Sequence, residues 1–420
     1  MTLLHSAIFI FVIIVVIDIV HYGALFLFLR GVVRKEWSAP TTPFTPKTAV
    51  ILTLRGADPF LNHCIEGLLQ QDYPNYTVFL VVDNADDPAL PIVQNIVEKL
   101  QALNVETIVV DEHFDTCSLK CNSLIHAVES LDESYEVIAL LDADTHPHST
   151  WLRHLVEPLS DSRFVAATGQ RWYMPEKDNF GSLVRYLWNA AAIVQMYLYR
   201  MAWGGSLALH RRVFTEGKLG DLWKYAFADD VSIMPCVRAI GGKTAFVPDL
   251  FMVNRETCTL ASFHRWVKRQ LLCAKIHHPA WNAVVVQALL ITIPLLLAFV
   301  LLILALIQCN VAAALWCLAS LLLYWAGVFG TLPMMERGIR NKLRERNEPM
   351  KPRTFSTLWR ALVAVPLTQM VYTSALFWLY FLKCVEWRGI EYEITGEQVR
   401  MVEYKPYLSQ SSEQNDGHSL

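Results

Sequence analysis

A run of apolar residues, 137–141, ends in two aspartates one residue apart, Asp142 and Asp144. Side chains alternate along a strand, so both carboxylates are expected on the same side at the carboxyl end of a buried parallel strand, where open α/β sheets bind ligands. Such a pair forms a hard-cation site that keeps positions open for diphosphate oxygens, as Mg²⁺ or Mn²⁺ requires. The alternative interpretation is a pair of solvated turn residues that cap the following helix.

Two further acidic pairs fall at expected strand ends or loops. Asp86 and Asp87 are suited to hold a nucleobase or a ribose, and Asp229 with Asp230 could lie beside a reacting hydroxyl. Because aspartate is favoured at the start of a helix, the second pair could also be a helix cap. The stretch 263–270 then places basic residues on a helix just before an apolar segment, which an ordinary membrane-interface belt would also do.

These residues would be positioned by a doubly wound, mostly parallel α/β sheet. Strand patterns alternate with helical patterns at a pace typical of such folds, and the strand 137–141 is expected near the centre. The expected strands are Ala49–Leu54, Tyr76–Val82, Thr107–Val110 and Val137–Leu141, and the expected helices are Pro59–Gln71 and Ser118–Leu131. Phe180–Trp203 is apolar and aromatic but carries arginines, which fits either an interfacial amphipathic helix or a buried domain helix.

The composition indicates a membrane protein. Of the 420 residues, 54% are hydrophobic and only 18% are charged, and the length leaves room for a catalytic domain and membrane segments. The net charge of −3 gives no support for nucleic-acid binding. The nine cysteines are scattered, without a Cys-x-x-Cys pair and without histidines at metal-site spacing, so we expect reduced thiols and no zinc site.

The apolar segment Ala7–Leu29 is expected to be an uncleaved membrane anchor. Arg30, Arg34 and Lys35 follow it and place the next domain in the cytoplasm by the positive-inside rule. Asp18 lies within the anchor. A charge inside the membrane is costly, which marks Asp18 either as functional or as a partner of a neighbouring helix.

Three more hydrophobic spans are expected toward the C-terminus. Ala283–Ile307 and Val311–Val328 form a helical hairpin, and the basic loop 331–356 after it is expected in the cytoplasm. The last span, Leu358–Leu382, contains Arg360 and Pro366, so it either crosses the membrane or is re-entrant or interfacial. The expected organisation is an anchor (1–35), a cytoplasmic catalytic domain (48–280), a transmembrane region (281–384) and a tail (385–420).

The order of these motifs resembles that of membrane-embedded family 2 glycosyltransferases with the GT-A fold, most closely the ceramide glucosyltransferase branch. The resemblance covers Val50–Pro279 and is strongest in three stretches: Leu54–Pro59, Gln71–Pro74 and Asp86–Ala89. The later Glu386–Gly389, followed by Tyr392, resembles the ending of related enzymes. The combination of motifs is specific, whereas no single piece is.

On the donor side, the resemblance implies that Asp87, with Asp86, lies beside the uracil and the ribose. It also implies that Asp142 and Asp144 hold the diphosphate together with Mn²⁺ or Mg²⁺. Further substrate-binding residues that it implies are Arg55, Lys120 and Asn122, the last two resembling a basic–polar pair found before the second aspartate motif.

On the acceptor side, the resemblance implies that Asp230, with Asp229 beside it, is the general base that takes the proton of the acceptor hydroxyl. In-line attack would then invert the anomeric carbon. Arg265 and Trp266 would contact the diphosphate and close the acceptor pocket, and Gly205 would lie in the loop that shapes the acceptor side.

Two positions depart from the pattern of the family. Ser262 stands three residues before Arg265, where relatives carry Gln or Arg, and Arg269 with Gln270 could compensate for that loss. Asp229 stands where many relatives carry glutamate, which keeps a carboxylate at that position.

A glycosyl transfer requires that the charge of the leaving UDP be neutralised and that a carboxylate lie near the acceptor oxygen. We therefore expect an integral, multi-pass membrane enzyme that transfers a sugar from a UDP-sugar to a lipid hydroxyl of the ceramide or diacylglycerol type. The expected partners are the UDP-sugar, the membrane lipid and the bilayer. The alternatives are a processive polysaccharide synthase of the same fold, for which four spans at most are few, and a non-catalytic membrane scaffold.

Overall fold

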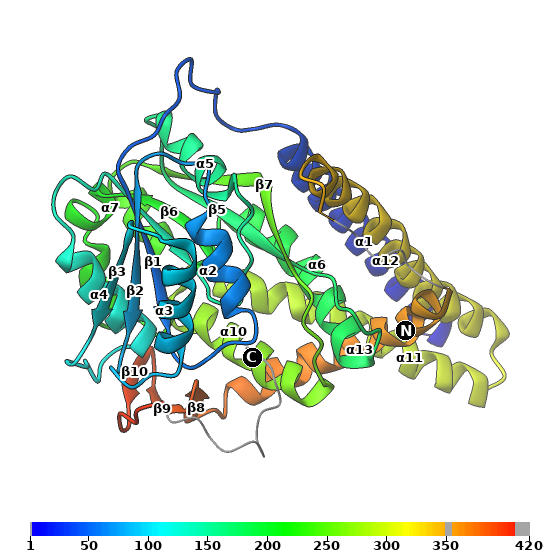
Figure 1. Ribbon diagram of the computed structural model, residues 1–420. Coiled ribbons are helices and arrows are strands. Elements are labelled where there is room, and N and C mark those ends of the chain that lie inside the picture. The colour runs from blue at the N-terminus through cyan, green and yellow to red at the C-terminus, as the bar shows by residue number, and fades with distance from the viewer. Residues whose placement is uncertain (1, 349–354, 408–420) are drawn as a thin grey trace.

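A computed structural model describes residues 2–348 and 355–407 of the chain. It contains an α/β domain, a group of long helices that extends from one side of it, and a small C-terminal sheet on the lower edge of the domain in Figure 1.

A seven-stranded sheet forms the centre of the α/β domain, in the order β3-β2-β1-β4-β6-β5-β7. The strands are β1 (Thr48–Leu54), β2 (Tyr76–Val82), β3 (Val105–Val109), β4 (Val137–Leu141), β5 (Phe164–Tyr173), β6 (Ser206–His210) and β7 (Lys243–Asn254). Only β6 runs against its neighbours, β4 and β5, and every other adjacent pair is parallel. The predicted doubly wound, mixed and mostly parallel sheet is confirmed.

Both faces of this sheet are covered, which explains why its strands are continuously apolar. On β1, Val50 and Leu52 point into one core while Ala49 and Ile51 point into the other, because side chains alternate along a strand. The first face is covered by α2 (Leu61–Leu69), α3 (Ala89–Leu100), α5 (Trp151–Val156) and the 3₁₀ helix η1 (Glu157–Ser160). The second face is covered by α4 (Leu119–Ser130), α7 (Arg212–Thr215), α8 (Leu219–Trp223) and α9 (Ile233–Ala239).

Two helices, α6 (Phe180–Tyr199) and α10 (Leu260–His277), lie between the α/β domain and the long helices. Arg185 on α6 is fully buried, and its Nη1 pairs with Oε2 of Glu256 at 3.1 Å. The helix contacts β5 of the domain and also α1 and α13 of the long-helix group. The segment Phe180–Trp203 was predicted as either an interfacial helix or a buried domain helix. The buried domain helix fits α6, because a fully buried and paired arginine does not face lipid.

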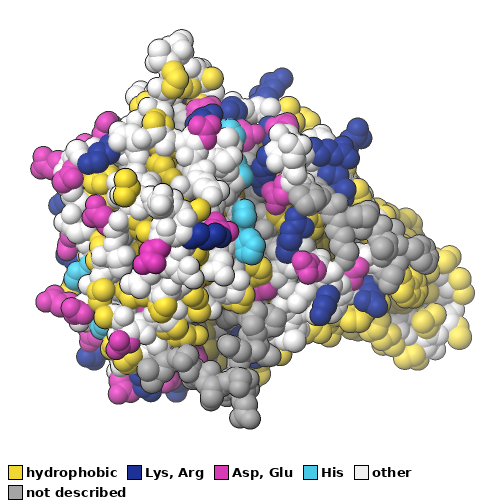
Figure 2. Space-filling model, in the orientation of Figure 1, with side chains coloured by type: hydrophobic (Ala, Val, Ile, Leu, Met, Phe, Trp, Pro, Cys, Tyr) yellow, Lys and Arg dark blue, Asp and Glu magenta, His cyan; other side chains and the backbone are white. Residues whose placement is uncertain are grey.

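Four helices of the described residues are long and apolar enough to span a membrane: α1 (Leu3–Val33), α11 (Trp281–Ile307), α12 (Val311–Glu345) and the part Trp359–Leu379 of α13 (Phe355–Leu379). Hydrophobic side chains gather at the end of the molecule that projects from the α/β domain, whereas charged side chains are spread over the domain (Figure 2). α1 and α12 run parallel side by side, since Asp18 lies against Gly327 and Leu29 against Gly338.

The basic segment that was predicted as a loop over 331–356 is instead helical as far as Glu345, and residues 349–354 lie outside the described part of the chain. Six of the ten residues 336–345 are charged. The charges suggested a loop, but here they contact the α/β domain: Lys342 Nζ, for example, lies 2.9 Å from Oδ1 of Asp249. These contacts allow α12 to continue beyond its apolar part as one helix.

The end of the chain returns to the α/β domain. After α13, β8 (Cys384–Trp387), β9 (Ile390–Thr395) and β10 (Gln398–Met401) form an antiparallel sheet, and Arg388 Nη2 lies 2.9 Å from Oδ2 of Asp58. Near the start of α13, Arg360 Nη1 donates to the carbonyl of Asp178 at 2.7 Å. Both ends of α13 therefore contact the same domain, which favours the re-entrant or interfacial interpretation of this span. The last part of the predicted tail, 408–420, lies outside the described residues.

This topology can be tested with the chain's own cysteines. Cys309 and Cys384 are exposed, and the other seven cysteines are buried. Because α11 leads away from the α/β domain and both ends of α13 contact it, we expect a membrane-impermeant maleimide to reach Cys309 and Cys384 from opposite faces of sealed vesicles. Labelling of the Cys309→Ser and Cys384→Ser variants, on vesicles of both orientations, measures this. Labelling of both cysteines from one face would contradict the topology.

Candidate active site

The carboxyl ends of β1, β2 and β4 meet at one edge of the sheet, because these three strands are adjacent and parallel. Arg55 follows β1, Asp83 follows β2 and Asp142 follows β4. Arg55 and Asp83 form an ion pair beneath this edge. Burial raises the pKa of Asp83, an effect that Arg55 opposes. The strand order thus brings three charged groups from separate parts of the sequence to one place.

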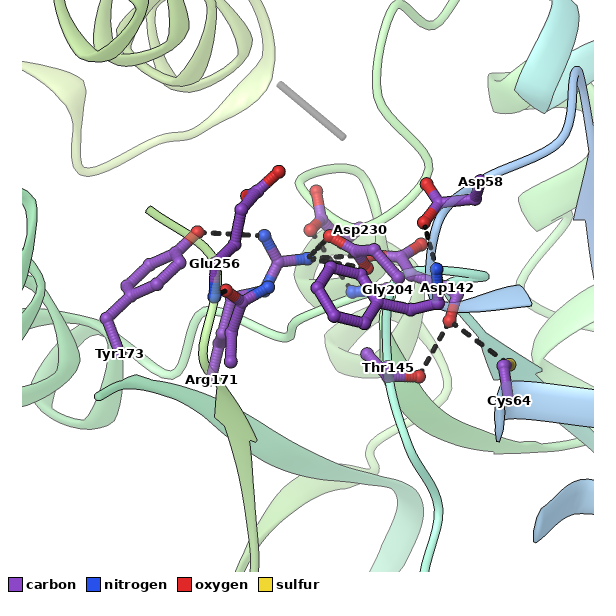
Figure 3. Close-up of polar contacts among 12 residues, drawn as sticks. Asp58, Cys64, Asp142, Thr145, Arg171, Tyr173, Gly204, Asp230 and Glu256 are labelled. Atoms are coloured by element: carbon purple, nitrogen blue, oxygen red, sulfur yellow. Dashed lines mark hydrogen bonds and ion pairs between the residues drawn. The ribbon is translucent and has the colours of Figure 1, made fainter. Parts of the chain in front are cut away.

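Asp142 and Asp144 lie beside two half-buried cations, Lys120 and Arg171. Lys120 Nζ is 2.8 Å from Asp142 Oδ1, and Arg171 Nη2 is 3.1 Å from Asp142 Oδ2 and 3.4 Å from Asp144 Oδ2. Figure 3 shows the Arg171 guanidinium, from β5, pointing toward Asp142. Burial would raise the pKa of Asp142, but Lys120 and Arg171 outweigh it and the pKa is lowered. Burial raises the pKa of Asp144, although Arg171 opposes this rise.

The chemistry of Asp142 and Asp144 fits a divalent cation. Mg²⁺ and Mn²⁺ prefer carboxylate oxygens, and one or two carboxylates often suffice when substrate phosphates complete the coordination shell. Within residues 2–348 and 355–407, no group of three or more His, Cys, Asp or Glu side chains is placed to hold a metal ion. A cation at this pair would therefore need ligands from a bound diphosphate as well.

Lys120 joins the two acidic pairs of the site. Besides its contact with Asp142, its Nζ lies 2.9 Å from Oδ1 of Asp229. Lys120 comes from the first turn of α4. Burial opposes the charge on this ammonium, but Asp142 and Asp229 raise its pKa above the usual value. A single half-buried cation thus lies between the predicted metal pair and the predicted base pair.

Asp230 lies at the same cavity with a pKa suited to proton transfer. Its Oδ2 accepts a hydrogen bond from the backbone N–H of Gly204 at 3.2 Å. Burial, and then the negative charge of Asp229, raise the pKa of Asp230 to about 7. The alternative role as a helix cap is not observed, because α9 begins after Ser232 without a side-chain cap. A carboxylate with this pKa can accept a proton near neutral pH.

The two residues directly before β6, Gly204 and Gly205, approach these carboxylates closely because they have no side chains. A Cβ atom at Gly205 would lie 2.5 Å from Oδ2 of Asp142, and one at Gly204 would collide with the carboxylate of Asp229. Only glycine leaves room for both side chains. The predicted role of Gly205 in shaping the site therefore has a steric basis.

On α10, the residues that face the cavity recur at helical spacing. Trp266, Arg269 and Gln270 line it, whereas Arg265 is exposed on the flank of the helix and does not. The ring of Trp387 lies 5.1 Å from the Arg269 guanidinium. The structure thus brings Trp266, Arg269 and Gln270 to the site but does not bring Arg265, because one residue of offset turns a helical side chain by about 100°.

Three other predicted residues do not line the cavity. Asp86 is exposed. Asp87 is buried, and its carboxylate accepts hydrogen bonds from the backbone of Gly56 at 2.9 Å and of Ala89 at 2.8 Å, so it fixes the turn after β1. Asn122 is buried as well, where it bonds the backbone of the loop before α4. Asp87 and Asn122 thus hold the backbone beside the cavity rather than facing it.

The residues that sequence reasoning missed come mainly from distant parts of the chain. Arg388 reaches the site from the C-terminal sheet, and its carbonyl oxygen accepts from Arg55 Nε at 2.8 Å. Tyr392 Oη accepts from the backbone N–H of Leu119 at 3.1 Å. Both belong to the C-terminal stretch, Glu386–Gly389 and Tyr392, that resembles the ending of related enzymes. That resemblance was the signal by which the sequence could have indicated them. Arg171, within an apolar strand, carried no such signal.

A continuous cavity of about 1040 Å³ connects this site to the long helices. Its polar end contains Asp142, Asp144, Asp229 and Asp230. Its other end is lined by apolar and polar residues of α1, α6, α11, α12 and α13, among them Val12, Val16, Asp18, Leu187, Asn189, Leu290, Tyr324, Thr331, Val365 and Gln369. The arrangement provides a charged reaction site at one end and a largely apolar compartment at the other.

A family model described as Glycosyl transferase family 21 matches residues 10–399. The chain is 22% identical over 153 residues to a ceramide glucosyltransferase of Komagataella phaffii, a match that covers 36% of this chain and 29% of that protein. It is 26% identical over 123 residues to a ceramide glucosyltransferase of Candida albicans, covering 26% and 22%. The matches therefore span less than a third of these relatives.

Among solved structures, a mannosyltransferase from Pyrobaculum calidifontis in complex with GDP-Man and Mn²⁺ is 18% identical, with a TM-score of 0.48, covering 89% of this chain and 99% of that one. The family model, by contrast, extends from the first long helix to the C-terminal sheet. Since it spans nearly the whole chain, the chain belongs to glycosyl transferase family 21.

Proposed function

We propose that this chain transfers a sugar from a UDP-sugar to the hydroxyl of a membrane lipid, of the ceramide or diacylglycerol type, with inversion at the anomeric carbon. The observation that carries the proposal is the cavity that connects Asp230 to the apolar helices. A lipid can place its chains among those helices while its hydroxyl reaches the carboxylates, whereas a water-soluble acceptor would not need apolar walls. The ceramide glucosyltransferases that the chain resembles support a lipid acceptor.

The donor would lie along the carboxyl ends of the parallel strands. Its nucleoside would lie near Arg55 and Asp83, and its diphosphate near Asp142 and Asp144. Mn²⁺ or Mg²⁺ held by Asp142 and Asp144 would offset the charge of the leaving diphosphate. Asp87 would contribute by holding the backbone of Gly56, which lines the cavity.

Besides the metal ion, the Arg269 guanidinium is a positive charge available to the diphosphate. It lines the cavity, and its contacts among the described residues include an aromatic ring but no carboxylate within 4 Å. Burial lowers the pKa of Arg269 to about 10, so the group stays charged at neutral pH. A buried cation that lacks an anionic partner is stabilised when an anionic ligand arrives. We assign to Arg269 the role that the sequence suggested for Arg265.

Asp230 would act as the general base. The acceptor oxygen attacks the anomeric carbon from the side opposite the diphosphate, the bond from that carbon to the diphosphate oxygen breaks, and Asp230 takes the hydroxyl proton. The backbone N–H of Gly204 holds one oxygen of Asp230 in place for this step. Lys120 pairs with the neighbouring Asp229 and holds it in place.

We further propose that the catalytic domain lies in the cytoplasm. Arg30, Arg34 and Lys35 follow the apolar part of α1 at the end that meets the domain, and the basic end of α12 lies at the same side. Short segments rich in Lys and Arg stay cytoplasmic. The lipid acceptor would then be taken from the cytoplasmic leaflet.

The proposal can be tested by sugar transfer with purified, detergent-solubilised protein, Mn²⁺, a panel of UDP-sugars and a mixed lipid extract. A single glycolipid product is the expected result. A polymer of high molecular weight would favour the polysaccharide synthase, and the absence of both product and UDP release with every donor would favour a scaffold.

Replacement of Asp230 by Asn is expected to lower kcat by about 10²- to 10⁴-fold, because the amide cannot take the acceptor proton. Initial rates of transfer measure this loss. The control is Asp221→Asn, which removes an exposed aspartate of α8 and should leave the rate unchanged. Equal rates for Asp230→Asn and the wild type would exclude Asp230 as the base.

The rate of the wild type should also depend on pH in a defined direction. Because the pKa of Asp230 is raised to about 7, the carboxyl is protonated below that value and cannot act as a base. We expect kcat/KM to rise through pH 7 and to level off above it, as the base ionises. A rate that is flat between pH 5 and pH 8 would contradict this assignment.

A comparison of two arginines on one helix tests the diphosphate site. Arg269→Gln should weaken UDP binding by at least about tenfold, because a charged hydrogen bond to an anion is lost. Arg265→Gln removes the same charge from an exposed position on α10 and should change the affinity little. Calorimetric titration of both variants with UDP and Mn²⁺ gives the affinities. A larger loss in Arg265→Gln would reverse the assignment.

A further inference from the structure

Arg171 of β5 pairs with both of the carboxylates that are proposed to hold the divalent cation. Its Nη2 lies 3.1 Å from Oδ2 of Asp142 (Figure 3) and 3.4 Å from Oδ2 of Asp144. Lys120 Nζ adds a second positive charge, 2.8 Å from Oδ1 of Asp142. We propose that Arg171 holds these carboxylates until a nucleoside diphosphate binds, and that it then exchanges them for the diphosphate while the carboxylates bind the cation.

The charges around Asp142 and Asp144 disfavour a divalent cation that binds alone. Each of the two carboxylates already has a positive partner within 3.4 Å. The four side chains line the cavity and are at most 23% exposed, so water screens their charges only partly. A cation on its own would have to displace a positive group from these oxygens or share them with it. A cation that binds together with a diphosphate brings a negative charge that offsets this repulsion.

Arg171, rather than Lys120, is the group that must change its partner. Lys120 Nζ also lies 2.9 Å from Oδ1 of Asp229, so it keeps an anionic partner when Asp142 binds a cation. The ion pairs of Arg171 within the described residues are with Asp142 and Asp144, and the cation needs both. A largely buried guanidinium that loses its carboxylates is stabilised by another anion, and a diphosphate suits a guanidinium well.

The other contacts of Arg171 hold the guanidinium in the wall of the cavity. Its Nη1 donates to Oη of Tyr173 at 3.0 Å, and its Cζ lies 4.9 Å from the centre of the Trp203 ring. These contacts are independent of the carboxylates, and arginine both stacks on aromatic rings and presents several donors in one plane. Nη2 can therefore turn from a carboxylate to a phosphate oxygen while Tyr173 and Trp203 keep the group in place.

The exchange couples the binding of the cation to that of the nucleotide. Without nucleotide, Arg171 competes with the cation for its ligands, whereas with nucleotide the same guanidinium is engaged by the diphosphate. Each of the two ligands therefore raises the affinity for the other by the same factor, as linkage requires. This inference rests on the proposed function in one respect, since it takes Asp142 and Asp144 as the cation site and a UDP-sugar as the donor.

Binding of Mn²⁺ to the full-length protein in detergent tests the exchange without any sugar transfer. Electron paramagnetic resonance measures free Mn²⁺ during a titration, once without and once with saturating UDP. We expect UDP to tighten Mn²⁺ binding strongly in the wild type. Arg171→Gln should bind Mn²⁺ alone at least about tenfold more tightly than the wild type, because the competing charge is gone. The factor by which UDP tightens Mn²⁺ binding should fall by about the same amount in this variant.

The matched control is Arg163→Gln, which removes an arginine that pairs with Asp161 away from the cavity wall. It should change neither quantity, and Arg171→Lys, which keeps the positive charge, should change both less than Arg171→Gln does. An Arg171→Gln variant that binds Mn²⁺ alone as weakly as the wild type, or in which UDP has its full effect, would overturn the proposal. Should Arg171→Gln fail to fold, Arg171→Met provides the same comparison.

The sugar-transfer assay keeps the two proposals apart. If the wild type transfers sugar from a UDP-sugar to a lipid but Arg171→Gln binds Mn²⁺ and UDP as the wild type does, the exchange at Arg171 is wrong and the proposed function stands. If the wild type transfers no sugar to any lipid but the binding pattern depends on Arg171 as expected, the exchange stands and the proposed function is wrong.

Discussion

The site depends on one half-buried ammonium, Lys120, held between carboxylates from different parts of the chain. Lys120 contacts Asp142, at the end of β4, and Asp229, in the loop before α9. Without it, the negative charges of Asp142 and Asp229 would face each other with no cation between them, which destabilises a partly desolvated site. The same contact keeps Asp142 and Asp229 at a fixed separation, as the proposed in-line displacement would need.

The glycine loop before β6 follows from this arrangement. Once Asp142 and Asp229 are held together, the backbone that passes them has no space for a side chain, and Gly204 with Gly205 is the result. The loop in turn presents the N–H of Gly204 to Asp230. The orientation of the proposed base is therefore a consequence of the charge pairing next to it.

Local pattern was sufficient to predict β1, β2, β3 and β4 and the residues at their ends, whereas β5, β6 and the C-terminal strands were not predicted. An apolar run followed by Asp142 and Asp144 identifies both a strand and a site, because strand period and burial are local properties. Arg171 and Arg388 could not be found in this way, since strand order and the return of the C-terminal sheet bring them to the site. Arg265 was misplaced for a related reason: the sequence supplies a basic helix but does not say which of its sides faces inward.

The membrane region shows the same limit. Charge density in 336–345 predicted a loop, and only the contacts with the α/β domain explain why this segment is helical. For the last span, Arg360 and Pro366 left two topologies open, and the ion pair between Arg388 and Asp58 favours the one in which the chain returns to the domain. In both cases the deciding interactions join residues that are distant in sequence.

The return of the C-terminal sheet has a consequence for how the protein is made. Arg388 and Tyr392, which complete one wall of the cavity, are translated more than 300 residues after Arg55, which lies on the same wall. The α/β domain can therefore fold and bury its sheet while the cavity is still open, and the cavity closes only when the last strands have left the ribosome. A chain that stops after the long helices would keep its sheet and its aspartates but would lack one side of the site. The order of synthesis thus gives every incomplete chain an unfinished site.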